Sequence, residues 1–195
     1  MRFAHLLLSG TAVLGLAACV RSDGITTVSQ RDSRYESDDY AHEASVKPIL
    51  VVVRGTAFGL DQRSLEQAVA GNMQGADWGP HARFTTTPST DVGQMFSFVM
   101  LVNGPRNATA ASLCRDPSRA PASIEAPPAG EIRLIGGLCR YDQNMAEVTG
   151  RVDGVSGPQD PKFRTLIVAA TQELTSPQVT EHLLLHNHDS GGTNK

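Results

Sequence analysis

Alternating and continuous runs of apolar residues predict about five β-strands between residues 48 and 153. The continuous run 49–53 is rich in β-branched residues, which is typical of a strand covered on both faces. Residues 81–87 alternate more weakly. Residues 94–103 alternate strongly, with Phe96, Phe98, Met100 and Val102 on one face and Met95, Val99 and Leu101 on the other. We therefore expect residues 94–103 to lie in the centre of the sheet.

A β-hairpin is predicted over residues 131–153, with the polar residues 142–144 at its turn. A glycine pair at 136–137 interrupts the first strand and indicates a bulge. Successive side chains of a strand point to opposite faces. If Leu138 faces the core, Cys139 therefore points to the other face of the sheet.

Two amphipathic helices are also predicted. Asp61 is a good N-cap for the first helix, which Gly75 ends. The second begins at Asp160-Pro161, an N-cap followed by proline at the first helical position, and stops before Pro177. Its apolar stripe is the clearest in the chain and consists of Phe163, Leu166, Ile167, Ala170, Thr171 and Leu174. This order of elements predicts an α+β two-layer sandwich, with a mostly antiparallel sheet of about five strands and two helices.

The segments outside these elements lack an apolar period. Residues 20–47 are polar and charged, and such a composition buries too little surface to offset the entropy of ordering. We therefore expect residues 19–47 to be a flexible tether, residues 48–177 to fold, and residues 178–195 to form a polar tail. The loop over residues 104–130 is rich in Ala, Pro and Ser. A loop this long in a compact domain is either functional or tied down.

The start of the chain has the order of a secretory signal: a basic residue, an apolar run over residues 3–16, then small residues. The run is too short to span a bilayer, which needs about 20 apolar residues. Leu16-Ala17-Ala18-Cys19 resembles the lipobox of bacterial lipoproteins. The resemblance implies that residues 1–18 are a signal peptide removed before Cys19. It also implies that the Cys19 thiol carries a diacylglycerol and that the new amine is acylated, commonly with palmitate.

The residue after Cys19 is Val20 and not Asp. In the sorting pattern of enteric Gram-negative lipoproteins, this implies an anchor in the outer membrane, facing the periplasm. The formal net charge is −3, which argues against nucleic acid as a partner because a clustered basic face is its usual footprint. The rest of the chain is similar to the small proteobacterial envelope lipoproteins that have no assigned activity. That general likeness transfers no functional residue except Cys19.

Two further cysteines remain, Cys114 and Cys139. An exported chain meets an oxidising compartment, where a disulfide is the expected state of such a pair. Free buried thiols are the alternative. A zinc site is a poor fit, since two cysteines without CxxC spacing do not make a structural one. A disulfide would tie the loop over residues 104–130 to the sheet.

The tail contains the candidate metal ligands His182, His186, His188 and Asp189. His182 and His186 are four residues apart, so a helix would place both imidazoles on one face, and neutral imidazole is a common ligand for zinc, copper and nickel. Leu183 follows His182, so the general-base glutamate of the metalloprotease motif is missing. An incidental polar tail is the alternative interpretation, because disorder concentrates at termini.

No catalytic residue is predicted. Ser156, His81 and Asp91 form a triad only on paper, because Pro158 stands where the nucleophile elbow requires glycine. Residues 55–59 join a strand to a helix, as phosphate loops do, but lack the Lys-Ser/Thr ending.

We therefore expect an envelope lipoprotein with a soluble, periplasm-facing binding or structural domain. We expect the protein not to be an enzyme and to need no cofactor. Its expected partners are the membrane, through the lipid on Cys19, and an envelope protein. Two alternatives stay open: a metal-binding lipoprotein that uses the tail, and a small envelope hydrolase.

Overall fold

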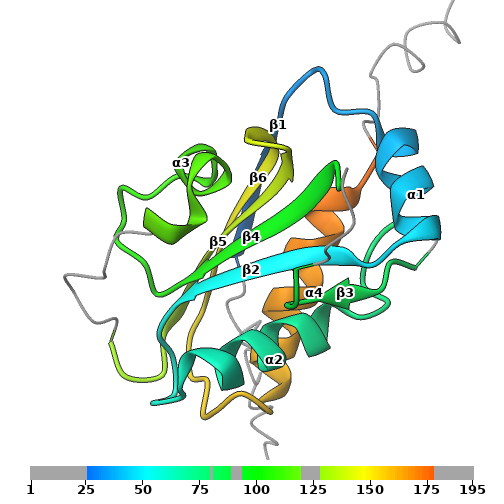
Figure 1. Ribbon diagram of the computed structural model, residues 1–195. Helices are drawn as coiled ribbons and strands as arrows, with labels where there is room; N and C mark the ends of the chain where they lie inside the picture. Colours follow the sequence, from blue (N-terminus) through cyan, green and yellow to red (C-terminus); the bar gives the residue numbers. More distant parts are fainter. Residues whose placement is uncertain (1–25, 80, 89–93, 120–127, 178–195) are drawn as a thin grey trace, which may run out of the picture.

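The computed structural model describes residues 26–79, 81–88, 94–119 and 128–177, which form an α+β fold on a six-stranded mixed sheet (Figure 1). The strands are β1 Thr26–Arg31, β2 Ile49–Gly55, β3 Phe84–Thr85, β4 Phe96–Val102, β5 Ile132–Arg140 and β6 Gln143–Val152. Their order across the sheet is β1-β6-β5-β4-β2-β3. The predicted α+β class is confirmed, and the sheet has one strand more than the expected five.

The sheet is antiparallel on one side and parallel on the other. The pairs β1–β6, β6–β5 and β5–β4 are antiparallel, whereas β2 runs parallel to both β4 and β3. β4 lies inside the sheet between β5 and β2, as its two apolar faces predicted. Phe98 and Met100 are buried on one face, while Val99 and Leu101 are buried on the other.

Three helices cover one face of the sheet, here called the core face: α1 Ser37–Val46, α2 Gln62–Met73 and α4 Pro161–Thr175 (Figure 1). Both predicted N-caps are present. The Asp61 carboxylate accepts a hydrogen bond from the Ser64 backbone N–H at 2.9 Å, and Asp160 accepts one from the Lys162 backbone N–H at 2.9 Å. Every member of the predicted α4 stripe is buried.

The prediction of a flexible tether over residues 19–47 is wrong for residues 26–46. This segment forms β1, which extends the sheet beside β6, and α1, which packs against the core face. Residues 19–25 lie outside the described residues. The folded part of the chain therefore begins no later than Thr26 and not at residue 48.

A few side chains explain how so polar a segment folds. Tyr40 is 1% exposed and contacts the rings of Phe96 and Phe98 edge-on, with centroids 5.9 and 6.1 Å away. Glu43 is buried, and its carboxylate accepts hydrogen bonds from the backbone N–H groups of Met95 and Phe96 at 2.8 and 3.1 Å. The segment thus supplies both apolar burial and hydrogen bonds to the start of β4.

The opposite face of the sheet carries one short helix, α3 Ala110–Arg115, followed by the 3₁₀ turn η1 Pro117–Arg119 (Figure 1). We call this side the α3 face. A separate apolar cluster lies there, formed by Val99, Leu101, Leu113, Cys114 and Cys139. Leu138 is buried on the core face. The predicted opposite orientation of Leu138 and Cys139 is therefore confirmed.

Smaller differences from the predicted elements have local causes. The strand expected over residues 81–87 shrinks to β3, because only Phe84 and Thr85 pair with β2. The bulge of the hairpin falls between Leu138 and Cys139, just after the glycine pair. Within the described ranges, no helix is both long and apolar enough to cross a bilayer.

Candidate functional site

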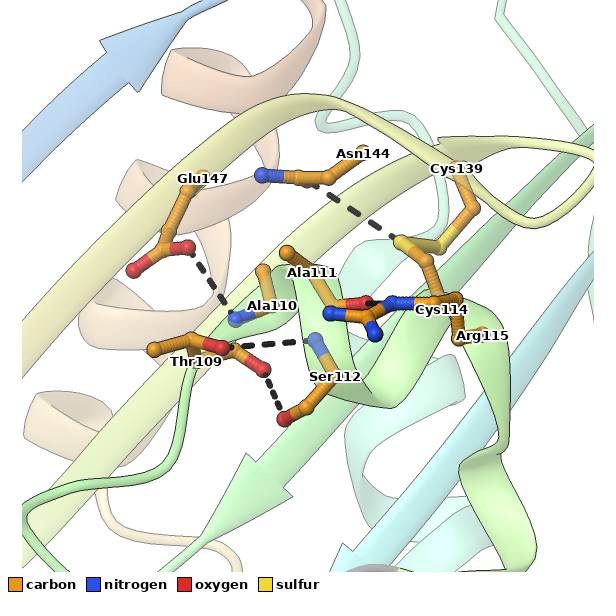
Figure 2. The surroundings of a disulfide bond; sticks show 9 residues. All are labelled: Thr109, Ala110, Ala111, Ser112, Cys114, Arg115, Cys139, Asn144 and Glu147. Atoms are coloured by element: carbon orange, nitrogen blue, oxygen red, sulfur yellow. Dashed lines mark hydrogen bonds between the residues drawn. A yellow bond between two sulfur atoms is a disulfide. The ribbon is translucent and has the colours of Figure 1, made fainter.

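The α3 face holds the site that the structure builds most clearly, and its first part is the seat of α3 (Figure 2). The Thr109 hydroxyl caps the helix by accepting a hydrogen bond from the Ser112 backbone N–H at 3.3 Å. Ala110 is the first residue of the helix, and its backbone N–H donates to Oε2 of Glu147 on β6 at 3.0 Å. A strand carboxylate therefore satisfies a donor that the helix leaves open at its first turn.

The predicted disulfide between Cys114 and Cys139 is present (Figure 2). The two Cα atoms are 5.5 Å apart, which is an ordinary separation for a disulfide. Cys114 is 6% exposed and Cys139 is 1% exposed. The Asn144 side chain lies beside the bond, with its Oδ1 4.0 Å from Sγ of Cys114. The bond joins the end of α3 to the end of β5.

Glycine in the centre of β5 allows α3 to sit this close to the sheet. A Cβ atom added to Gly137 would lie 2.7 Å from Cβ of Ala110 and 3.0 Å from Cγ2 of Val99. Real Cβ atoms essentially never approach other atoms within 3.0 Å. The glycine pair that predicted a bulge therefore has a packing role.

Next to α3, the same face has an open hollow of about 240 Å³. It is lined by Leu101, Gly104, Pro105, Arg106, Arg133, Leu134, Ile135 and Thr149. Most of the lining is apolar, but two arginines, Arg106 and Arg133, belong to it. A concave apolar surface with a few polar groups is the usual form of a ligand site.

Ion pairs organise the arginines around this hollow. Glu131 is 5% exposed in its side chain, and its carboxylate binds Arg133 at 3.4 Å and Arg151 at 2.9 Å. Arg151 is also 3.2 Å from Asp153. Arg106 is exposed and forms no ion pair with the described residues. Arg106, Arg133 and Arg151, together with the carboxylates of Glu131 and Asp153, are called the arginine cluster below.

A second polar site lies at the other end of the molecule, around Asp77. Oδ2 of this buried carboxylate accepts hydrogen bonds from the Tyr40 hydroxyl at 3.2 Å and from the Ala82 backbone N–H at 2.9 Å. Burial, together with the neighbouring Asp77 charge, raises the pKa of Tyr40. Oδ1 of Asp77 forms no hydrogen bond within the described chain, and Nδ1 of the exposed His81 lies 3.8 Å away. Sequence analysis does not find this site, because no periodic pattern or motif marks Asp77.

The structure does not bring Ser156 and His81, two members of the triad considered above, together. Ser156 lies near the start of α4, where its hydroxyl donates to Asp160 at 2.8 Å. His81 contacts Asp77 instead, near Trp78, whose backbone N–H donates to Thr175 at the end of α4. Asp91 lies outside the described residues.

The remaining predicted sites are the lipidated cysteine, the tail ligands and the turn after β2. Cys19 and the candidate ligands His182, His186, His188 and Asp189 lie outside the described residues. The turn at Gly55 is explained by packing, because a Cβ atom there would lie 1.8 Å from the Val102 carbonyl oxygen and φ is +98°. Among the residues that the structure places, no three His, Cys, Asp or Glu side chains are grouped to hold a metal ion.

Comparisons with known proteins add little. No protein-family model matches the chain, and no curated protein matches it. Among solved structures, the chain is similar to a PelC dodecamer from Paraburkholderia phytofirmans, with 13% sequence identity and a TM-score of 0.47. The match covers 78% of this chain and 99% of that chain. At this level the likeness carries no argument about function.

Proposed function

We propose that the chain is an envelope lipoprotein, anchored by a lipid on Cys19, whose domain faces the periplasm and binds a partner. The observation that carries the proposal is the sequence Leu16-Ala17-Ala18-Cys19 at the end of a short apolar run. The signal peptide would be residues 1–18, and Val20 favours the outer membrane as the destination.

The disulfide supports export independently of the leader. Disulfides persist in oxidising compartments such as the periplasm and are rare where thiol reductants are abundant. The bond between Cys114 and Cys139 is buried and joins two elements of the fold, so it is part of the architecture. Such a chain is expected to mature outside the cytoplasm.

The α3 face is the surface that best fits a binding role. It combines the open hollow with the arginine cluster, and it is covered less completely than the core face. The hydrolase alternative gains no support, since Ser156 and His81 lie near opposite ends of α4.

Metabolic labelling with a palmitate analogue in a Gram-negative host tests the anchor. The wild-type chain should incorporate the label and fractionate with the outer membrane, and Cys19→Ser should do neither. The variant Cys114→Ser/Cys139→Ser retains Cys19 and should still be labelled, which controls for the general loss of cysteine. Labelling of Cys19→Ser, or a wild-type chain that is processed but carries no lipid, would contradict the proposal.

A further inference from the structure

The folded domain begins very close to the proposed anchor. Thr26 opens β1 and is paired with Arg151 of β6. Seven peptide steps separate Cys19 from Thr26 in the sequence. A fully extended chain spans at most 3.3–3.6 Å per residue, so the lipidated cysteine lies within about 25 Å of Thr26. This limit follows from covalent geometry alone.

The arginine cluster and the hollow lie at the same end of the sheet as Thr26. Arg151 is the register partner of both Thr26 and Arg133. The loop with Pro105 and Arg106 follows directly after β4, at the end of that strand where Val102 pairs with Leu134. We call this the arginine end of the molecule.

The opposite end is the aromatic end, which includes the exposed side chains of Trp78 and Tyr141. Tyr141 lies at the turn between β5 and β6, eight or more strand residues from Arg151. At about 3.3 Å per residue, the two ends are about 26 Å apart along β6. The anchor is therefore attached at the arginine end, within about 25 Å of it, whereas the aromatic end lies about 26 Å further along the sheet.

We propose that the arginine end is a docking surface for the phospholipid bilayer that holds the anchor, with Arg106 and Arg151 contacting lipid phosphates. The proposal rests on the proposed lipidation of Cys19. Guanidinium groups bind phosphate through paired N–H donors, so arginine is well suited to this contact. Arg106 is exposed and Arg151 is 55% exposed in its side chain. Arg106 forms no ion pair with the described residues, whereas Arg151 would share its guanidinium between a lipid phosphate and the carboxylates of Glu131 and Asp153.

The hollow makes the same end suitable for lipid in a second way. Its lining includes the apolar residues Leu101, Pro105 and Ile135 and also Arg106. A phospholipid presents the same pair of features, because its phosphate is adjacent to the glycerol esters and acyl chains. The hollow therefore offers a phospholipid both apolar surface and an arginine side chain.

The chain's single tryptophan, Trp78, provides the probe for a test. The mature lipidated protein is reconstituted into vesicles of phosphatidylethanolamine and phosphatidylglycerol whose acyl chains carry bromine, which quenches tryptophan fluorescence at short range. In a Trp78→Phe background, Asn107→Trp reports the arginine end and Asp142→Trp reports the aromatic end. Both positions are exposed and lie in loops, so the two variants are matched.

We expect several-fold stronger quenching of Asn107→Trp than of Asp142→Trp, and little quenching of native Trp78. Adding Arg106→Gln and Arg151→Gln should reduce the quenching of Asn107→Trp, whereas Arg140→Gln at the aromatic end should not. Equal quenching at both ends, or stronger quenching at Asp142→Trp, would overturn the orientation while the anchor stands. A protein that does not float with the vesicles would overturn the anchor, and the orientation with it.

Discussion

On the core face three helices bury a continuous apolar cluster, whereas on the α3 face a six-residue helix buries only Ala110, Leu113 and Cys114. The helices of the core face pack against apolar residues of five strands, β2 to β6. A helix as short as α3 is marginal without tertiary packing. Its disulfide, its cap and the Glu147 contact replace the apolar area that it lacks. The comparison teaches that a small element can be held on a sheet by a few well-placed links.

The largest expected effect is the loss of a core-face aromatic. Phe163 is fully buried, and its ring meets that of Phe58 edge-on at 5.2 Å. Phe163→Ala should lower the free energy of unfolding by about 3–5 kcal/mol, measured by urea denaturation. The matched control on the other face is Leu113→Ala, for which we expect about 2 kcal/mol. Equal costs would show that the α3 face contributes as much packing as the core face.

The second effect concerns the disulfide of the α3 face. The bond closes a loop with a sequence separation of 25 residues. The chain-entropy estimate for such a loop is about 3 kcal/mol. Cys114→Ala/Cys139→Ala should therefore lower the melting temperature and speed tryptic cleavage after Arg115. Two free thiols in protein isolated from the envelope, found by mass spectrometry, would contradict the account of how α3 is held.

The glycine pair of β5 allows the two faces to be perturbed separately. A Cβ atom at Gly136 would meet Cγ1 of Val148 at 2.9 Å and Sδ of Met100 at 3.0 Å on the core face, whereas one at Gly137 would meet α3. Each substitution to alanine should cost about 1–3 kcal/mol through overpacking. Gly137→Ala should also increase tryptic cleavage after Arg115, and Gly136→Ala should not. Identical cleavage patterns would show that the faces are coupled.

The smallest expected effect is a loss of stability at alkaline pH. It arises on the core face, which contains the buried tyrosines Tyr35 and Tyr40. Burial raises the pKa of Tyr35 to about 12, from an ordinary value of 10.0. The unfolded chain releases that proton near pH 10, while the folded chain keeps it until about pH 12. Stability should therefore be unaffected by these groups below pH 10 and fall between pH 10 and 12. In Tyr35→Phe, this alkaline fall in melting temperature should be smaller; an unchanged fall would contradict the assignment.

The two faces also differ in how well the sequence predicted them. The stripe of α4 and the alternation in β4 are long and regular, so period alone located them. The opposite directions of Leu138 and Cys139 followed from strand parity and placed the disulfide on the correct face. These are the cases in which local pattern and tertiary contacts agree.

Residues 26–46 show where pattern fails. β1 is an edge strand without a strong apolar alternation, and α1 is held by Tyr40 and the buried Glu43, which composition counts as polar. Their energy comes from contacts with β4, β6 and α4, which are distant in sequence. The Asp77 site escaped notice for the same reason, since its Tyr40 donor is 37 residues away. Long-range hydrogen bonds leave no periodic signal in a sequence.

The pairing of β1 with β6 has a consequence for the order of events during synthesis. β1 is made before the other strands, yet its pairing partner β6 comes more than 100 residues later. The same is true of Glu173 on α4, whose backbone carbonyl accepts a hydrogen bond from Arg31. At 5–20 residues per second, a ribosome needs roughly 6–25 s to make that interval. β1 therefore cannot complete its pairing with β6 until residue 151 has been made. A chain truncated before β6 would leave both β1 and β5 without their shared pairing partner, and these open strand edges would be available for aggregation.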